Sequence, residues 1–92
     1  MKSEYQYPLN LEWSTNEMVV VMAMWDKLEQ AYEKGIKVTE LLATYQAFKT
    51  VVRSIGEERK LGKEFEVLSG YSLYHTIKEA QTTQKSIVKM KG

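Results

Sequence analysis

The sequence contains no cysteine, one histidine and one proline in 92 residues. Without cysteine the chain can form no disulfide and no thiolate-ligated zinc site, and nothing points to an oxidising compartment. A single histidine also falls short of the two Glu-x-x-His pairs that a di-metal helical bundle uses. We therefore expect no metal site and no cofactor.

Long hydrophobic runs and phosphate-binding glycine loops are missing as well. The longest unbroken apolar run, Met18–Trp25, is far shorter than the roughly 20 residues that a membrane-spanning helix needs. The start MKSEYQYPLN lacks the apolar region of a signal peptide. The glycines are scattered and match neither GxxxxGK nor GxGxxG. We predict a cytoplasmic protein that makes no membrane contact.

Net charge is small, at +1, but it is unevenly distributed. Residues 1–36 carry three lysines and six carboxylates, a net charge of −3, whereas residues 37–92 carry ten basic and six acidic side chains, a net charge of +4. Lys85, Lys89 and Lys91 close the chain with no acidic residue beside them. Nucleic-acid binders usually have strongly basic domains, so this distribution indicates at most a weak basic surface.

Helical periodicity between capping signals is what the sequence does contain. Ser14 and Glu17 form the pattern of a capping box, and Gly35 supplies a left-handed helix end. Together they predict a helix over 15–34. Its apolar stripe recurs at the spacing of one helix face: Met18, Val21, Trp25, Leu28 and Tyr32.

The same signals predict three more helices and no strand. Thr39 and Ser72 are expected N-caps, and Ser54 with Glu57 forms a second capping box. Residues 81–84 are polar and include weak helix formers, so the basic tail over 86–92 should fray. No segment alternates with period two, so no sheet is expected. The predicted helices cover residues 39–53, 55–68 and 72–85.

An extended arm over residues 1–13 precedes the first helix. Pro8 disfavours helix there, and aromatic and aliphatic residues surround it. The first half of the helix is apolar on every side, because Val19 and Met22 interrupt its polar face. We expect the arm to cover it, with a partner chain as the alternative. The fold predicted for residues 1–92 is a single all-α domain, a small four-helix bundle or array with this arm packed on helix one.

The stretch SGYSLYHT, residues 69–76, comes closest to catalytic chemistry. Ser72, His75 and Glu79 share one helix face, which resembles a Ser-His-acid set. An N-cap serine, however, engages its hydroxyl with backbone N–H groups, and the helical wheel turns His75 toward solvent rather than a cleft. We therefore predict no catalytic residues and no enzyme activity.

An interaction surface is the remaining interpretation of the exposed aromatic and polar residues. Tyrosine, tryptophan and methionine are favoured at protein interfaces, and we predict that Met22, Tyr74, His75 and Lys78 take part. A helix-turn-helix is disfavoured, because the helix over 55–68 carries a net charge of −1 and phosphate contacts dominate DNA affinity.

Three segments in order resemble a known family: YPLNLEWSTNEM, AYEKGIKVTELLATYQAFKTVV and EERKLGKEFEVLSGYSLYHTIKEA. They resemble the uncharacterised YktA-like family of small proteins from low-GC Gram-positive bacteria, from Tyr7 to about Ala80. The resemblance implies a compact all-helical fold and a cytosolic protein. It implies no activity and transfers no catalytic or binding residue. An arginine is common in that family at the position of His75, which argues against a required catalytic histidine.

The function predicted from the sequence is that of a small cytoplasmic protein-interaction or regulatory protein without catalytic activity. Its partner would be another protein, with a homodimer as an alternative. The runner-up is a weak nucleic-acid-associated protein that uses the basic C-terminal half. Whether the arm covers its own helix or a neighbour's remains open at this point.

Overall fold

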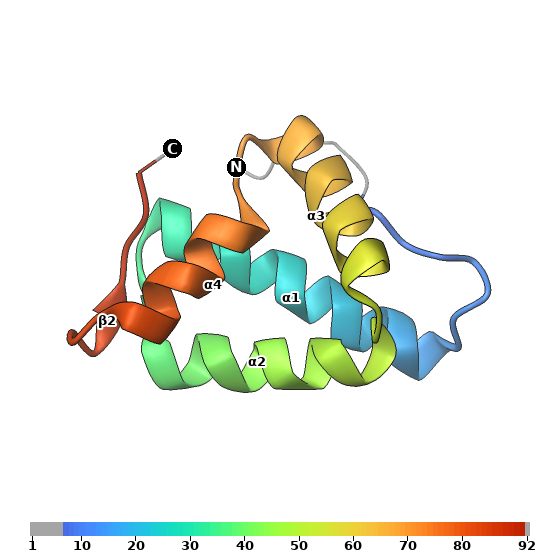
Figure 1. The fold of residues 1–92 in the computed structure, drawn as a ribbon, viewed down its shortest axis with the longest axis horizontal. Helices are drawn as coiled ribbons and strands as arrows, with labels where there is room; N and C mark the ends of the chain where they lie inside the picture. Colours follow the sequence, from blue (N-terminus) through green and yellow to red (C-terminus); the bar gives the residue numbers. More distant parts are fainter. Residues whose placement is uncertain (1–6, 92) are drawn as a thin grey trace.

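The computed structural model describes residues 7–91, so residues 1–6 and 92 lie outside the account that follows. The chain forms four helices and one two-stranded sheet in these residues (Figure 1). The elements in chain order are α1 (Thr15–Glu33), β1 (Ile36–Lys37), α2 (Val38–Val51), α3 (Ile55–Ser69), α4 (Leu73–Thr82) and β2 (Ile87–Val88). The predicted all-α fold with four helices is confirmed, apart from the small sheet.

Local signals account for most helix ends. The Ser14 hydroxyl accepts from the Glu17 backbone N–H at 3.1 Å, and the Glu17 carboxylate accepts from the Ser14 N–H at 2.8 Å, so the capping box is complete. Gly35 follows the helix with φ of 91°, a conformation that glycine adopts without strain. At α3 only half of the predicted box forms, since the Ser54 hydroxyl accepts from the Glu57 N–H without a reciprocal bond.

Three aromatic rings from three helices form the centre of the core. Trp25 of α1 stacks on Phe65 of α3 with 4.7 Å between ring centroids. Trp25 also packs edge-to-face against Phe48 of α2, with 5.6 Å between ring centroids. All three side chains are fully buried, and aromatic pairs of this kind contribute about 0.5–1.5 kcal/mol beyond their area burial. The trio therefore fixes α2 and α3 against α1.

The described part of the arm packs on α1 of its own chain. The Trp25 indole N–H donates to the Pro8 carbonyl at 3.1 Å, and the Tyr7 hydroxyl donates to the buried carboxylate of Glu29 at 2.9 Å. The arm does not cover the whole first half of the helix, however, because Val19 and Met22 stay exposed. The arm follows one side of α1, where Trp25 and Glu29 offer it polar partners.

The prediction that residues 86–92 fray is wrong for the described part of that segment. β2 pairs antiparallel with β1, with Val88 opposite Ile36, and the Met90 N–H donates to the Ala31 carbonyl at 2.8 Å. Val88 is 1% exposed, so the tail contributes to the core. Burial of Val88 and the backbone hydrogen bonds hold the tail in place although the polar residues 81–84 precede it.

The tail also changes the two neighbouring helices. α2 starts at Val38 rather than after a Thr39 cap, and the Val38 N–H donates to the Ser86 carbonyl at 2.8 Å. The predicted Thr39 cap is therefore wrong, because Thr39 lies inside the helix and the Ser86 carbonyl accepts from the N–H of its first residue. α4 ends at Thr82 and not at residue 85, since Thr83 adopts extended backbone and leads into β2.

Candidate functional site

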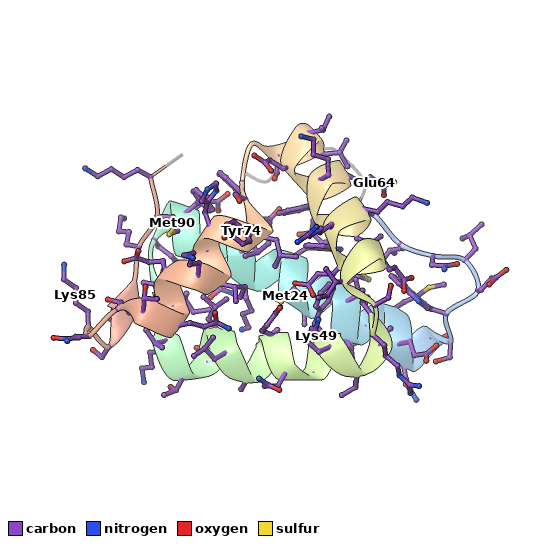
Figure 2. All side chains as sticks on the ribbon, in the orientation of Figure 1. Met24, Lys49, Glu64, Tyr74, Lys85 and Met90 are labelled. Carbon is purple, nitrogen blue, oxygen red and sulfur yellow. The ribbon has the colours of Figure 1, made fainter. Side chains whose placement is uncertain are left out.

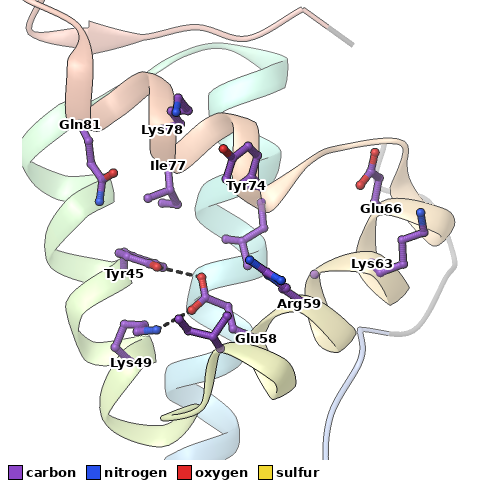
Figure 3. Close-up of a pocket in the computed structure, with 13 residues that line it drawn as sticks. Tyr45, Lys49, Glu58, Arg59, Lys63, Glu66, Tyr74, Ile77, Lys78 and Gln81 are labelled. Atoms are coloured by element: carbon purple, nitrogen blue, oxygen red, sulfur yellow. Dashed lines mark hydrogen bonds and ion pairs between the residues drawn. The ribbon is translucent and has the colours of Figure 1, made fainter.

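An open groove lies between α2, α3 and α4 and has a volume of about 450 Å³ (Figure 3). Its apolar part comes from the start and middle of α3 and the first two turns of α4: Ile55, Gly62, Leu73, Tyr74 and Ile77. Four cations from three helices also line it: Lys49, Arg59, Lys63 and Lys78. Glu58 and Glu66 bring the only carboxylates of this lining, so its net charge is +2.

Gly62 determines how closely α3 and α4 approach under the groove. It is buried, and a Cβ added there would lie 3.2 Å from Leu73 Cδ2. The sequence suggested only a glycine tolerated within a helix, whereas the structure shows a contact point between two helices. Leu73 can therefore pack directly on the α3 backbone and form the floor of the groove.

Glu58 links α2 to α3 at one end of the groove. One of its carboxylate oxygens accepts from the Tyr45 hydroxyl at 2.8 Å, and the other accepts from Lys49 Nζ at 2.5 Å. Burial, and then the hydrogen bond and negative charge of Glu58, raise the pKa of the Tyr45 hydroxyl above its ordinary value. Tyr45 therefore stays protonated at neutral pH and remains a donor to Glu58.

The other three cations of the groove are not neutralised in this way. Among residues 7–91, Arg59, Lys63 and Lys78 form no ion pair. Arg59 and Lys63 are four residues apart and so lie on the same face of α3, and Lys78 lies on α4 with its ammonium 5.8 Å from the centre of the Tyr74 ring. The groove thus combines an apolar floor with positive charge that its own carboxylates do not balance.

The structure places Ser72 and His75 in contact, but in the geometry of a helix cap. The Ser72 hydroxyl accepts from the His75 backbone N–H at 3.1 Å and lies 3.0 Å from His75 Nδ1. The Ser72 N–H in turn donates to the Tyr32 hydroxyl at 3.0 Å. Within residues 7–91, Glu79 makes no hydrogen bond to His75, so the third member of the sequence motif does not orient the imidazole.

The four predicted interaction residues do not lie on one surface. Tyr74 and Lys78 line the groove, whereas His75 and Lys78 line a hollow between α4 and the tail. Met22 is exposed on α1 and lines neither.

Sequence reasoning missed the α2 and α3 side of the groove. The four-residue spacing of Arg59 and Lys63 was visible, but nothing indicated which helix would lie opposite them. Tyr45 and Glu58 are thirteen residues apart and meet only through the packing of α2 against α3.

Residues 7–91 contain no group of three or more His, Cys, Asp or Glu side chains placed so that they could hold a metal ion. No helix in this part of the chain has the length and apolar character needed to cross a bilayer.

Comparison with known proteins places the chain in a family. Residues 4–89 match the model of the uncharacterised protein family UPF0223. A UPF0223 protein of Enterococcus faecalis is 60% identical over 78 residues, which cover 85% of each chain. UPF0223 proteins of Streptococcus sanguinis and Bacillus cytotoxicus are 44% and 48% identical, over 98% and 95% of this chain and 98% and 99% of their own lengths. These relatives come from low-GC Gram-positive bacteria, and the chain belongs to the UPF0223 family.

Proposed function

We propose that this protein is a small cytoplasmic interaction or regulatory protein without catalytic activity, and that it binds a partner protein through the groove between α2, α3 and α4. The observation that carries the proposal is the combination of exposed apolar side chains and unneutralised cations along one groove. We also propose that the protein is one of the YktA-like proteins and that it is located in the cytoplasm, as the resemblance to them implies.

Exposed large apolar side chains in the groove support a binding role. Ile55 and Tyr74 are 62% and 66% exposed, although both flank the buried floor formed by Leu73 and Ile77. Exposed apolar side chains that lie together and are rimmed by polar residues are a feature of interaction sites. Tyr74 carries a large aromatic ring, the kind of side chain that is enriched in the centres of protein interfaces.

A non-catalytic role is supported by the chemistry of the groove. A catalytic hydroxyl or acid needs a base within hydrogen-bond reach and a third group that orients it. The Glu58 carboxylate in the groove is already engaged with Tyr45 and Lys49. The Ser72 hydroxyl is engaged as a helix cap and lies outside the groove. Positioned binding groups are therefore the better interpretation of these residues.

Site-specific photocrosslinking tests the proposal. The chain would be produced in Enterococcus faecalis with p-benzoylphenylalanine in place of Tyr74 and, in a matched control, in place of Val67. Val67 is 75% exposed and lies on α3 outside the groove, so it is more accessible than Tyr74. We expect a discrete protein adduct from position 74 and none from position 67. No protein adduct at position 74, or equal adducts at both positions, would contradict the proposal.

The same experiment distinguishes the other candidates. An adduct with RNA or DNA in place of protein would support the nucleic-acid role. An adduct with a second copy of the chain would indicate the homodimer, and sedimentation of the purified protein would then show an association that depends on concentration.

A further inference from the structure

We infer that the partner enters the groove as an amphipathic helix that carries carboxylates beside its apolar face. The inference rests on the proposed function and names the chemistry of the partner segment. It follows from three features of the groove: the spacing of its cations, its apolar floor and the secondary structure of its walls.

The cations on α3 have the spacing of a helix. Arg59 and Lys63 lie four residues apart on one face, which places their Cβ atoms about 5–6 Å from each other. Like charges at this spacing destabilise an isolated helix slightly, and within residues 7–91 neither side chain has an ion-pair partner. Carboxylates four residues apart on an adjacent helix would match this pair. Lys78, on the facing helix α4, would contact the opposite edge of the same segment.

The remaining carboxylates of the groove limit where the partner's charges can lie. Glu58 is neutralised by Lys49 and accepts from Tyr45, so it offers no attraction to a cation. Glu66 lies one turn beyond Lys63 toward the C-terminal end of α3, and its side chain stands beside Lys63 in the close-up (Figure 3). We therefore expect the partner's carboxylates nearer to Arg59 than to Glu66.

The floor requires an apolar face, and the walls favour a helix over an extended peptide. Ile55 and Tyr74 are exposed beside the buried floor and would contact partner side chains at helical spacing, as in other helix-in-groove complexes. An extended peptide pairs its backbone with a free strand edge, but all three walls are helices whose backbone groups bond internally. Its own N–H and C=O groups would lose water without gaining partners. A helix satisfies its own backbone groups.

A polynucleotide fits the groove less well than an acidic helix. The groove's net charge of +2 is small for a backbone that carries a phosphate at every nucleotide. Of the tail lysines, Lys91 lines the hollow beside α4 together with Lys78, whereas Lys85 lies far from the groove. Lys85 projects beyond the C-terminal end of α4, at the opposite end of the molecule from Glu64 of α3 (Figure 2). Lys85 therefore does not extend the row of cations that lines the groove.

Selection from a displayed peptide library tests the inference. The library fixes leucine at positions i, i+3 and i+7 of a helical peptide and randomises the rest. We expect enriched peptides to carry Asp or Glu four residues apart next to the leucine face. On binding to the full chain, a synthetic copy of an enriched peptide should shift the NMR signals of Ile55 and Ile77, while those of Val67 should not move.

Two charge-reversed proteins supply the matched comparison. The rim variant, Arg59→Glu with Lys63→Glu, reverses the two α3 cations that line the groove. The tail variant, Lys85→Glu with Lys89→Glu, makes the same change of four charge units near the chain end. All four side chains are exposed, so both variants should fold, as circular dichroism would verify. The rim variant should bind the peptide about tenfold more weakly, which corresponds to about 1.4 kcal/mol. The tail variant should stay within about twofold of the wild type.

The outcomes separate this inference from the proposed function. Enrichment of neutral or basic peptides, no enrichment, or equal losses in the two variants would overturn the inference. The cellular adduct at position 74 gives the second readout, because digestion identifies the crosslinked segment of the partner. A protein adduct through a segment that is neither acidic nor helical would refute the acidic helix and leave the interaction role standing. Absence of any protein adduct would refute the interaction role itself.

Discussion

Replacing Val88 by alanine should destabilise the protein although the residue belongs to a two-residue strand near the chain end. Val88 is 1% exposed and pairs with Ile36, whereas its neighbour Ile87 is 45% exposed. Val88→Ala removes two buried carbons at about 0.8 kcal/mol each, and the unfilled space adds a cavity cost. We expect a loss of about 2 kcal/mol. That is a large share of the roughly 5–14 kcal/mol expected for a chain of this length.

The assay is urea unfolding followed by circular dichroism, with Ile87→Ala as the matched control. The control removes more carbon atoms from a side chain that is half in solvent, so it should cost less than about 1 kcal/mol. Thermal unfolding should show a difference of several degrees between the two variants, since about 1 kcal/mol shifts the midpoint by about 4–8 °C in a domain of this size. Equal stabilities, or a larger loss for Ile87→Ala, would refute the docking of the tail on the core.

Two other predictions concern Tyr45 and the glycines. The pKa of Tyr45 is higher in the folded than in the unfolded chain, so its stabilising contribution is fully present below the ordinary tyrosine pKa of about 10 and is lost as pH rises above it. Tyr45→Phe should therefore cost about 1 kcal/mol at pH 7, and the gap to the wild type should close in alkaline urea titrations; a gap that does not change with pH would contradict the raised pKa. Gly35→Ala should cost about 1–2 kcal/mol because φ is positive there, whereas Gly56→Ala, where an added Cβ meets nothing within 4 Å, should be neutral or slightly stabilising. Similar melting temperatures for the two alanine variants would contradict the assigned backbone conformations.

Local chemistry explains why the sequence alone predicts much of the helical layout. The cap formed by Ser14 and Glu17 joins groups three residues apart, and Gly35 acts through its own backbone. Such signals do not depend on the rest of the fold, so they can be recognised in the sequence alone. The apolar stripe that contains Trp25 similarly indicated which face of the first helix is buried.

The tail and the groove could not be predicted in the same way because they depend on contacts between distant segments. A strand of two residues is too short to show a period, and Val88 becomes buried only because Ile36 offers it a partner. Thr39 carried a plausible capping signal, but the helix begins one residue earlier, where the Val38 N–H donates to the Ser86 carbonyl of the distant tail. The hydrogen bond between Tyr45 and Glu58 likewise forms only when α2 and α3 have packed against each other.

The central claim is that the groove between α2, α3 and α4 is the binding surface, and photocrosslinking in the charge-reversed proteins tests it most directly. With p-benzoylphenylalanine at position 74, the yield of the protein adduct would be compared between the Arg59→Glu, Lys63→Glu variant and the Lys85→Glu, Lys89→Glu variant at equal expression. The account predicts that the rim variant loses about nine-tenths of the adduct, as a tenfold weaker affinity implies when the partner is not saturating, while the tail variant retains it. Equal yields from the two variants, or a loss confined to the tail variant, would contradict the account.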